Sequence, residues 1–336
     1  MGEVAGQGAV VEANLEAFKF TGNGAEFFRI WIVNILLTIL TLGIYSAWAK
    51  VRTKSYFYGN TWLQGNTFAY LASPIAILKG RLIAVGFIVL WSVASDILPA
   101  LGLLIGLFIL SIIPWLICRS LRFNAINSSY RNMRFNFVGR WFDAAMAFSV
   151  WPLLGVLTLG LLLPVALNKQ QSFMVGKSCY GTTGFHFDVP VSDFYKICIA
   201  AIALMIVGAI VAAVLVAIIP PLAGALGILA YLVAFAYFRA HIFNVTYAGS
   251  TLAEHGFETS MTTAGIAWLY FSNMLAMSMT LGLFYPWARV RSARYMADSL
   301  QAKLAGPLDQ FIAAETERVG ALGEEMGDML DLDIGL

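Results

Sequence analysis

The chain has 336 residues, of which 60% are hydrophobic and 12% are charged, and its formal net charge is +2. With a mean hydropathy of +0.77, this composition excludes an ordinary soluble domain, in which about 25% of residues are charged. The basic residues are spread along the chain, which argues against nucleic-acid binding through one basic patch. Cysteine and histidine spacings indicate no metal site, and no phosphate loop or nucleophile elbow occurs. We therefore expect a membrane protein that is not an enzyme and carries no cofactor.

Seven apolar segments are long enough to cross a membrane, since about 20 helical residues span a hydrocarbon core of about 30 Å. They predict an all-α polytopic protein. The approximate segments are Phe27 to Trp48, Pro74 to Ser95, Leu98 to Cys118, Ala144 to Val165, Lys196 to Ile219, Pro221 to Phe238 and Gly265 to Tyr285. Tight turns at residues 96–99 and 220–221 predict that the second and third segments form one helical hairpin, and the fifth and sixth another.

The motif Thr-Leu-Gly recurs three times, at residues 41–43, 158–160 and 280–282. Phe18, Phe135 and Phe257 precede the three copies at equivalent positions. This recurrence indicates an internal repeat: a three-helix unit, an inverted copy and a partial third copy. The predicted divisions are an outer segment 1–26, a first unit 27–134, a second unit 135–256, a partial third unit 257–302, and an acidic, flexible tail 303–336 whose residues 308–322 could form a short amphipathic helix.

Basic residues orient the predicted helices, because cytoplasmic loops retain Lys and Arg. Seven spans with the N-terminus outside and the C-terminus in the cytoplasm place most of the basic residues inside. An odd number of helices per unit would invert each copy relative to the last. In the alternative topology, the Thr-Leu-Gly helices are re-entrant, entering the membrane and returning at the glycine.

The residue pattern resembles a known family. It consists of residues 20–28 (FTGNGAEFF), Asn34, residues 41–45 (TLGIY), Trp48, Arg52, residues 59–61 (GNT), Gly65 and Phe68. In this order it is similar to the YjgN family of bacterial inner-membrane proteins, also described as domain of unknown function 898, over roughly residues 18 to 300. The resemblance implies a polytopic bacterial inner-membrane protein of unsettled activity, and it provides no functional residues.

Polar and small residues inside the predicted spans are candidate pathway or helix-break positions. Asn34 and Asn273 each lie seven residues before a Thr-Leu-Gly motif, and a buried amide in lipid either bonds a neighbouring helix or faces a polar path. The motif threonines could bond their own helix backbone, and the motif glycines could allow close packing or a helix break. These motif candidates are Thr41, Thr158, Thr280, Gly43, Gly160 and Gly282.

Aromatic and basic residues beside the motifs are candidates for lipid-headgroup contact. Trp48 and Trp287 are expected at the membrane interface, and Arg52 and Arg291 would attract anionic headgroups. The expected partner is the lipid bilayer, a homo-oligomer stays open, and no nucleic acid is expected. We place first a transporter or channel for a small or lipid-like solute; the alternative is a non-transporting protein that organises lipids or scaffolds partner proteins.

Overall fold

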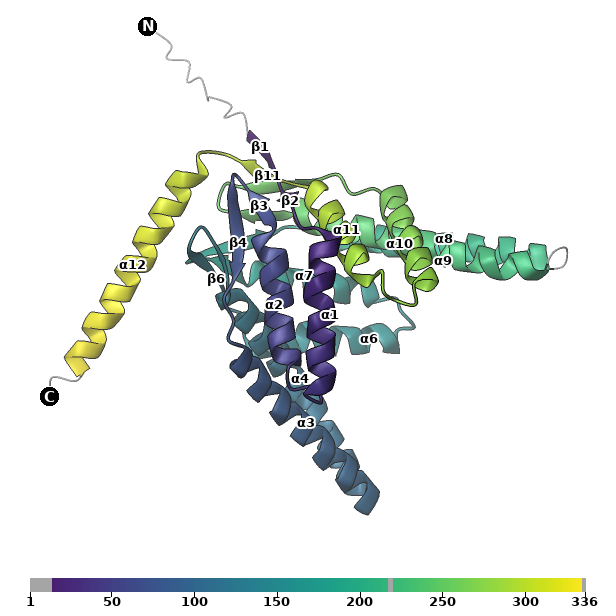
Figure 1. Ribbon diagram of the computed structural model, residues 1–336, viewed down its shortest axis with the longest axis horizontal. Helices are drawn as coiled ribbons and strands as arrows, with labels where there is room; N and C mark the ends of the chain where they lie inside the picture. The colour runs from purple at the N-terminus through teal and green to yellow at the C-terminus, as the bar shows by residue number, and fades with distance from the viewer. Residues whose placement is uncertain (1–13, 217–219, 334–336) are drawn as a thin grey trace, which may run out of the picture.

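The computed structural model describes residues 14–216 and 220–333, and four of its helices are long and apolar enough to cross a membrane. They are α3 (Pro74–Ile97), α4 (Pro99–Ile126), α8 (Val191–Val216) and α9 (Pro220–Ala248). The pairs α3–α4 and α8–α9 form two long helical hairpins that project from the body in different directions (Figure 1). Proline at the first or second position of α4 follows the chain reversal, because its missing N–H has no helical partner there.

The three Thr-Leu-Gly segments form short hairpins instead of single spans. The first hairpin is α1 (Gly24–Leu40) and α2 (Ser46–Gly59), and the third is α10 (Thr263–Met279) and α11 (Tyr285–Asp298). The middle hairpin comprises α5 (Trp141–Ala145), the π-helical η1 (Met146–Val150) and α6 (Trp151–Leu157), followed by α7 (Leu163–Gly176). The predicted count of about seven spans is therefore not confirmed, because the chain turns back at each Thr-Leu-Gly motif.

Each Thr-Leu-Gly turn has the same local cause. In the first copy, Leu42 and Gly43 both have positive φ, 50° and 92°, and the same signs recur in the other two copies. The Thr41 hydroxyl donates to the Leu37 carbonyl at 2.7 Å and accepts from the Tyr45 amide at 2.9 Å. The left-handed backbone of Leu42 and Gly43 ends the first helix, and glycine adopts this conformation without steric cost. The Thr41 hydroxyl connects the end of one helix to the start of the next.

Short strands lie between the helical hairpins, which the all-α prediction missed. They are β1 (Asn14–Ala17), β2 (Lys19–Phe20), β3 (Thr61–Leu63), β4 (Asn66–Tyr70), β5 (Ser128–Tyr130), β6 (Met133–Phe137), β7 (Ser178–Tyr180), β8 (Thr183–Phe187), β9 (Ser250–Leu252), β10 (Gly256–Thr259) and β11 (Leu300–Leu304). One sheet has the order β2-β3-β4-β5-β6-β7-β8-β9 and the other β1-β11-β10, with every pairing antiparallel. Strands of two to five residues are too short for a long alternating pattern to be visible in the sequence.

The two sheets join into one strand ring. At one junction β1 runs into β2 through Phe18, whose amide donates to the Leu300 carbonyl at 3.2 Å. At the other junction β9 and β10 are linked by an antiparallel bridge between Leu252 and His255. These two junctions connect the ends of the two sheets. All five helical hairpins therefore leave the ring and return to it.

The strand ring encloses an aromatic and aliphatic core. Phe68 stacks on Tyr130 with ring centroids 4.7 Å apart, and Phe135 meets Tyr180 edge-on at 5.2 Å. Phe18 and Phe135, which marked equivalent positions in the sequence, both pack against this core. Burial raises the pKa of Tyr180 to about 12, so its hydroxyl stays protonated and donates to the Tyr130 carbonyl at 3.0 Å. Residues from distant parts of the chain thus share one core.

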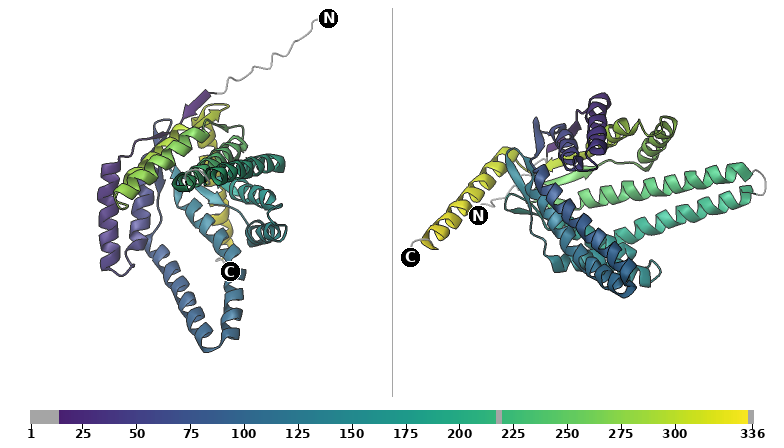
Figure 2. Two further views of the ribbon diagram at one scale, coloured as in Figure 1. Left: turned by 90° about the vertical axis from the view of Figure 1, so that its right-hand side faces the viewer. Right: turned by 60° about the horizontal axis from the view of Figure 1, so that its bottom comes forward.

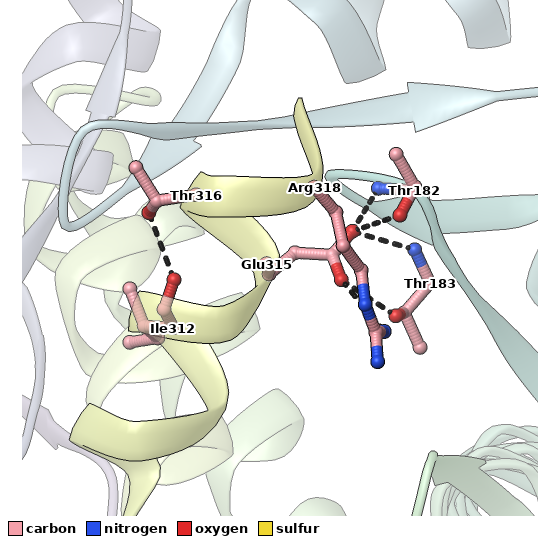
Figure 3. Close-up of polar contacts among 6 residues, drawn as sticks. All are labelled: Thr182, Thr183, Ile312, Glu315, Thr316 and Arg318. Atoms are coloured by element: carbon pink, nitrogen blue, oxygen red, sulfur yellow. Dashed lines mark hydrogen bonds and ion pairs between the residues drawn. The ribbon is translucent and has the colours of Figure 1, made fainter. Parts of the chain in front are cut away.

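Helix α12 (Leu308–Asp333) begins against this core and then projects away from the ring (Figures 1 and 2). Leu308 and Ile312 are buried in the core. Glu315, with 0% of its surface exposed, accepts hydrogen bonds from the backbone amides and hydroxyls of Thr182 and Thr183 in the β7–β8 turn (Figure 3). Burial alone would raise the pKa of Glu315, but these four hydrogen bonds outweigh it and hold the pKa below its usual value. The start of α12 is therefore latched to the ring.

The strand ring changes three other expectations from the sequence. β1 pairs with β11, so residues 14–17 and 300–304 lie in one sheet, and the predicted placement of the two ends on opposite sides is not supported. The units were expected to be inverted, yet each begins and ends at the same ring. The flexible tail, predicted from residue 303, starts inside β11 and continues as α12 through Asp333, because the turn of Thr182 and Thr183 holds it.

Candidate functional site

The first and third short hairpins pack side by side (Figure 1). The candidate site lies between them. Trp287 of α11 lies against Phe28 of α1, with ring centroids 5.2 Å apart, and Trp31 lies 5.9 Å from Tyr285. Gly24 is required here, because a Cβ atom at this position would come within 2.2 Å of the Trp287 ring. Trp287, expected to be an interfacial anchor, is therefore part of the hairpin contact.

A cavity of about 400 Å³ that is largely open to the outside lies between these two hairpins, and its volume is within the range of small-molecule sites. The first hairpin contributes two aromatic rings and a hydroxyl, and the third contributes a thioether, a phenol and the glycine of its Thr-Leu-Gly turn. The lining residues are Phe27, Trp31, Thr53, Met277, Gly282 and Tyr285. The cavity thus extends from Phe27, in the first turn of α1, to the Gly282 turn at the far end of the third hairpin.

Asn273 has a specific partner in the third hairpin. Its Oδ1 accepts from the Arg291 guanidinium at 2.8 Å, and a second guanidinium nitrogen donates to the Ser272 hydroxyl at 2.9 Å. Asn273 is 4% exposed. A charged donor strengthens such a hydrogen bond, and the pairing ties α10 to α11. Arg291, a predicted headgroup contact, is directed toward its own hairpin.

Asn34 occupies the equivalent position in the first hairpin but is not bonded in the same way. It is 5% exposed, and within the described part of the chain neither atom of its side-chain amide has a hydrogen-bond partner. Arg52 is the counterpart of Arg291 in the sequence, yet its side chain is exposed. A buried amide without partners costs about 1–3 kcal/mol, so Asn34 is a strained polar position beside the cavity-lining residues Phe27 and Trp31 on α1.

The remaining predicted residues divide between the turns and the surface. The three motif threonines each donate to a carbonyl four residues back at 2.7 Å. The middle copy, Thr158 and Gly160, lies on a different hairpin and lines no part of the cavity. Trp48 stacks on Tyr45 with ring centroids 6.2 Å apart. The structure therefore brings Gly282 and Trp287 to this region and leaves the middle motif outside it.

Arg289 is the residue near the cavity that sequence reasoning missed. Its guanidinium carbon lies 5.3 Å from the centroid of the Phe57 ring and 6.0 Å from that of Tyr285, so it bridges the two hairpins by cation–π contacts. Among the described residues, no ion pair involves Arg289. The basic cluster after the third motif contains Arg289, but only the fold shows which of its arginines lies beside the cavity.

Comparison with known proteins identifies the family. The bacterial family of unknown function DUF898 matches residues 15–329. The chain belongs to the DUF898 family. It is 25% identical to the inner membrane protein YjgN of Salmonella typhimurium over 89% of this chain and 91% of that protein. It is 35% identical to YjgN of Escherichia coli O157:H7 over 36% of this chain and 31% of that protein. No solved structure matches the chain.

Membership in DUF898 confirms the resemblance found in the sequence. The match includes the strand ring and reaches into α12, beyond the predicted limit near residue 300. Four long apolar helices and the relatives named as inner membrane proteins support a membrane protein. Among the described residues, no group of three or more His, Cys, Asp or Glu side chains could hold a metal ion.

Proposed function

We propose that this DUF898 protein is a multi-pass inner-membrane protein, without enzymatic activity, that organises the lipids of the leaflet next to its strand ring. The observation that carries the proposal is the common origin of all five hairpins at one ring, with three of them ending in exposed leucine turns. Leu42, Leu159 and Leu281 are 94%, 96% and 94% exposed. Transfer of each leucine from water into acyl chains is worth about 2 kcal/mol, so these turns favour insertion into lipid.

The short hairpins have the length to enter one leaflet only. Glu26 and Arg29 keep the start of α1 near the ring-side membrane surface, and from Ile30 to Leu40 the helix rises about 16 Å at 1.5 Å per residue. That is about half of a 30 Å hydrocarbon core. On the return, Lys50 lies about 6 Å along α2 from the turn, and its long side chain extends toward the ring-side headgroups. Insertion into one leaflet would displace lipids there and not in the opposite leaflet.

The distribution of basic residues supports a cytoplasmic ring. No Lys or Arg occurs from residue 82 to 118 or from 197 to 238, the stretches that carry the far ends of both long hairpins. The basic residues instead follow the ring-side ends of the hairpins and the strands. By the positive-inside rule, the ring and the described ends, residues 14–17 and 308–321, lie in the cytoplasm.

The long hairpins support lipid contact over an enclosed transport path. They project separately from the body (Figures 1 and 2), and none of the most apolar 18-residue window of α3 or α8 is buried. Asn34 and Asn273, the intramembrane candidates for a pathway, belong to short hairpins that reach one leaflet. We therefore place the lipid-organising function before transport, the other function that the sequence leaves open.

The orientation is tested with single cysteines in a chain lacking Cys118, Cys179 and Cys198. Gln64→Cys lies in the β3–β4 turn of the ring, and Asp96→Cys lies at the far end of the α3–α4 hairpin. In intact cells, a membrane-impermeant thiol reagent should label position 96 and should reach position 64 only after permeabilisation. Labelling of both positions from one side would contradict the proposed topology.

The lipid role is tested by thermal unfolding in vesicles of phosphatidylcholine with and without phosphatidylglycerol. The anionic lipid should raise the unfolding midpoint, and Arg52→Gln should reduce this gain because Arg52 is an exposed cation near the membrane surface. The matched control is Arg134→Gln, an exposed arginine in β6 of the ring. Equal midpoints in both lipid mixtures would refute the lipid-organising function.

A further inference from the structure

We infer that the cavity between the first and third short hairpins holds one acyl chain of an anionic phospholipid, with the lipid phosphate bound by Arg289. This inference rests on the proposed function, because it needs the hairpins to lie in the ring-side leaflet. It adds a defined site and a ligand class to a protein whose other lipid contacts are spread over exposed apolar surfaces.

The first argument is the order of chemical groups along the hairpins. Arg289 lies one helical turn, about 6 Å, nearer the ring than the cavity-lining Tyr285. The cavity continues from Tyr285 past Met277 to Gly282 in the turn at the far end of the hairpin. An anionic lipid fits this arrangement, because its phosphate can meet the cation at the membrane surface while its acyl chain occupies the apolar cavity in the leaflet. A free phosphate would use the cation and leave the cavity empty.

The second argument is the state of the Arg289 side chain. Arg291 is bonded to Asn273 and Ser272, and Arg294 donates to the Gly22 carbonyl at 3.0 Å. Arg289 instead lies against the rings of Phe57 and Tyr285, is exposed, and takes part in no hydrogen bond or ion pair found among the described side chains. The two rings flank the guanidinium while its N–H groups stay available, and a planar guanidinium suits bidentate phosphate binding.

The third argument is the comparison among the three Thr-Leu-Gly hairpins. Counted from each motif, Leu167 of the middle hairpin occupies the place of Arg289, and Leu163 that of Tyr285. The first hairpin has Lys50 and Ser46 at these positions. Only the third hairpin combines the arginine with a ring to position it, and it faces the first hairpin across the cavity. The site is therefore specific to this pair of hairpins.

The experiment measures lipid retained by the full-length protein. Protein from vesicles of mixed phosphatidylglycerol and phosphatidylcholine is analysed by native mass spectrometry. Wild type should retain one phosphatidylglycerol in preference to phosphatidylcholine. Met277→Trp should obstruct the middle of the cavity and Arg289→Gln should remove the phosphate contact, and each should lower the retained fraction at least fivefold. Met277→Leu, which nearly conserves volume, and Arg134→Gln should both behave as wild type.

The outcomes separate this site from the proposed function. If Met277→Trp and Arg289→Gln keep their unfolding midpoints and still retain the lipid, the cavity is not its site, while stabilisation by anionic vesicles would leave the broader function intact. If wild type is not stabilised by anionic lipid at all, both proposals fail. If a variant does not fold, the milder Met277→Phe and Arg289→Lys provide the test, and unchanged retention in both would overturn the inference.

Discussion

Replacing Glu315 tests whether α12 is latched to the strand ring. Glu315→Ala removes a fully buried carboxylate that accepts hydrogen bonds from two backbone amides and two hydroxyls of Thr182 and Thr183. Hydrogen bonds to a charged group contribute about 1.5–3 kcal/mol each, but the four act on one group and are not additive. Because the threonine groups regain water when α12 leaves, we expect a loss of about 2–4 kcal/mol in docking free energy.

The loss should be visible as local opening. Hydrogen exchange followed by mass spectrometry reports the opening free energy of amides in residues 308–321. At 1.36 kcal/mol per tenfold change, exchange there should accelerate about 30-fold to about 1,000-fold in Glu315→Ala. Glu315→Gln keeps one acceptor oxygen and should show an intermediate change. Amides in α3 and α8 should exchange as in wild type.

Glu317→Gln provides the matched control, because Glu317 lies on the same helix with its side chain exposed. It should change exchange by less than twofold. The sign of the pH effect is fixed by the lowered pKa of Glu315: its stabilisation is complete above the unfolded value of 4.5 and is lost as the pH falls through the folded value. Exchange of residues 308–321 within twofold of wild type in Glu315→Ala at pH 7 would refute the latch.

Three further predictions concern buried polar residues of the hairpins, the contact of α12 with His255, and the Thr-Leu-Gly turn. Asn273→Leu should destabilise the protein by about 1.5–3 kcal/mol, because Arg291 loses its hydrogen-bond acceptor. Asn34→Leu should be neutral or stabilising, because no hydrogen bond is lost. Equal losses of stability for the two variants, measured by unfolding in vesicles, would contradict this. His255 contacts Phe311 of α12, with ring centroids 5.2 Å apart, and its Nδ1 accepts from the Ala305 amide. Burial lowers the pKa of His255, so protonation below the unfolded value of 6.5 should weaken α12 docking. The protection factors of α12 amides, which are corrected for the intrinsic pH dependence of exchange, should then fall between pH 7 and 5.5. His255→Gln should abolish that fall. Gly43→Ala should lower the free energy of unfolding by about 1–2 kcal/mol in chemical denaturation, because φ at Gly43 is +92°. Gly59→Ala should leave it unchanged, because Gly59 has open space around it and an ordinary backbone conformation. Similar unfolding midpoints for the two variants would argue against a fixed turn.

The sequence predicts the parts of this protein whose cause is local. Composition identifies a membrane protein, and the runs from Pro74 to Ser95 and Lys196 to Ile219 are apolar enough to identify spans by themselves. The tight turn at residues 96–99 is marked by a proline that begins α4. Thr41 and Gly43 are recognisable as special positions. The sequence left open whether Gly43 allows close contact between helices or marks the end of a helix.

Tertiary structure decided how these parts are arranged. An apolar run is compatible with one span or with a turn at Leu42, and the left-handed backbone of Leu42 and Gly43 produces the turn. The strands have two to five residues and are stabilised by partners distant in the sequence, as when Leu15 pairs with Lys303. Such partners are not visible in a local pattern. The ring brings residues 14–17 and 300–304 into one sheet, and it sets the first hairpin against the third, which places Arg289 beside the cavity.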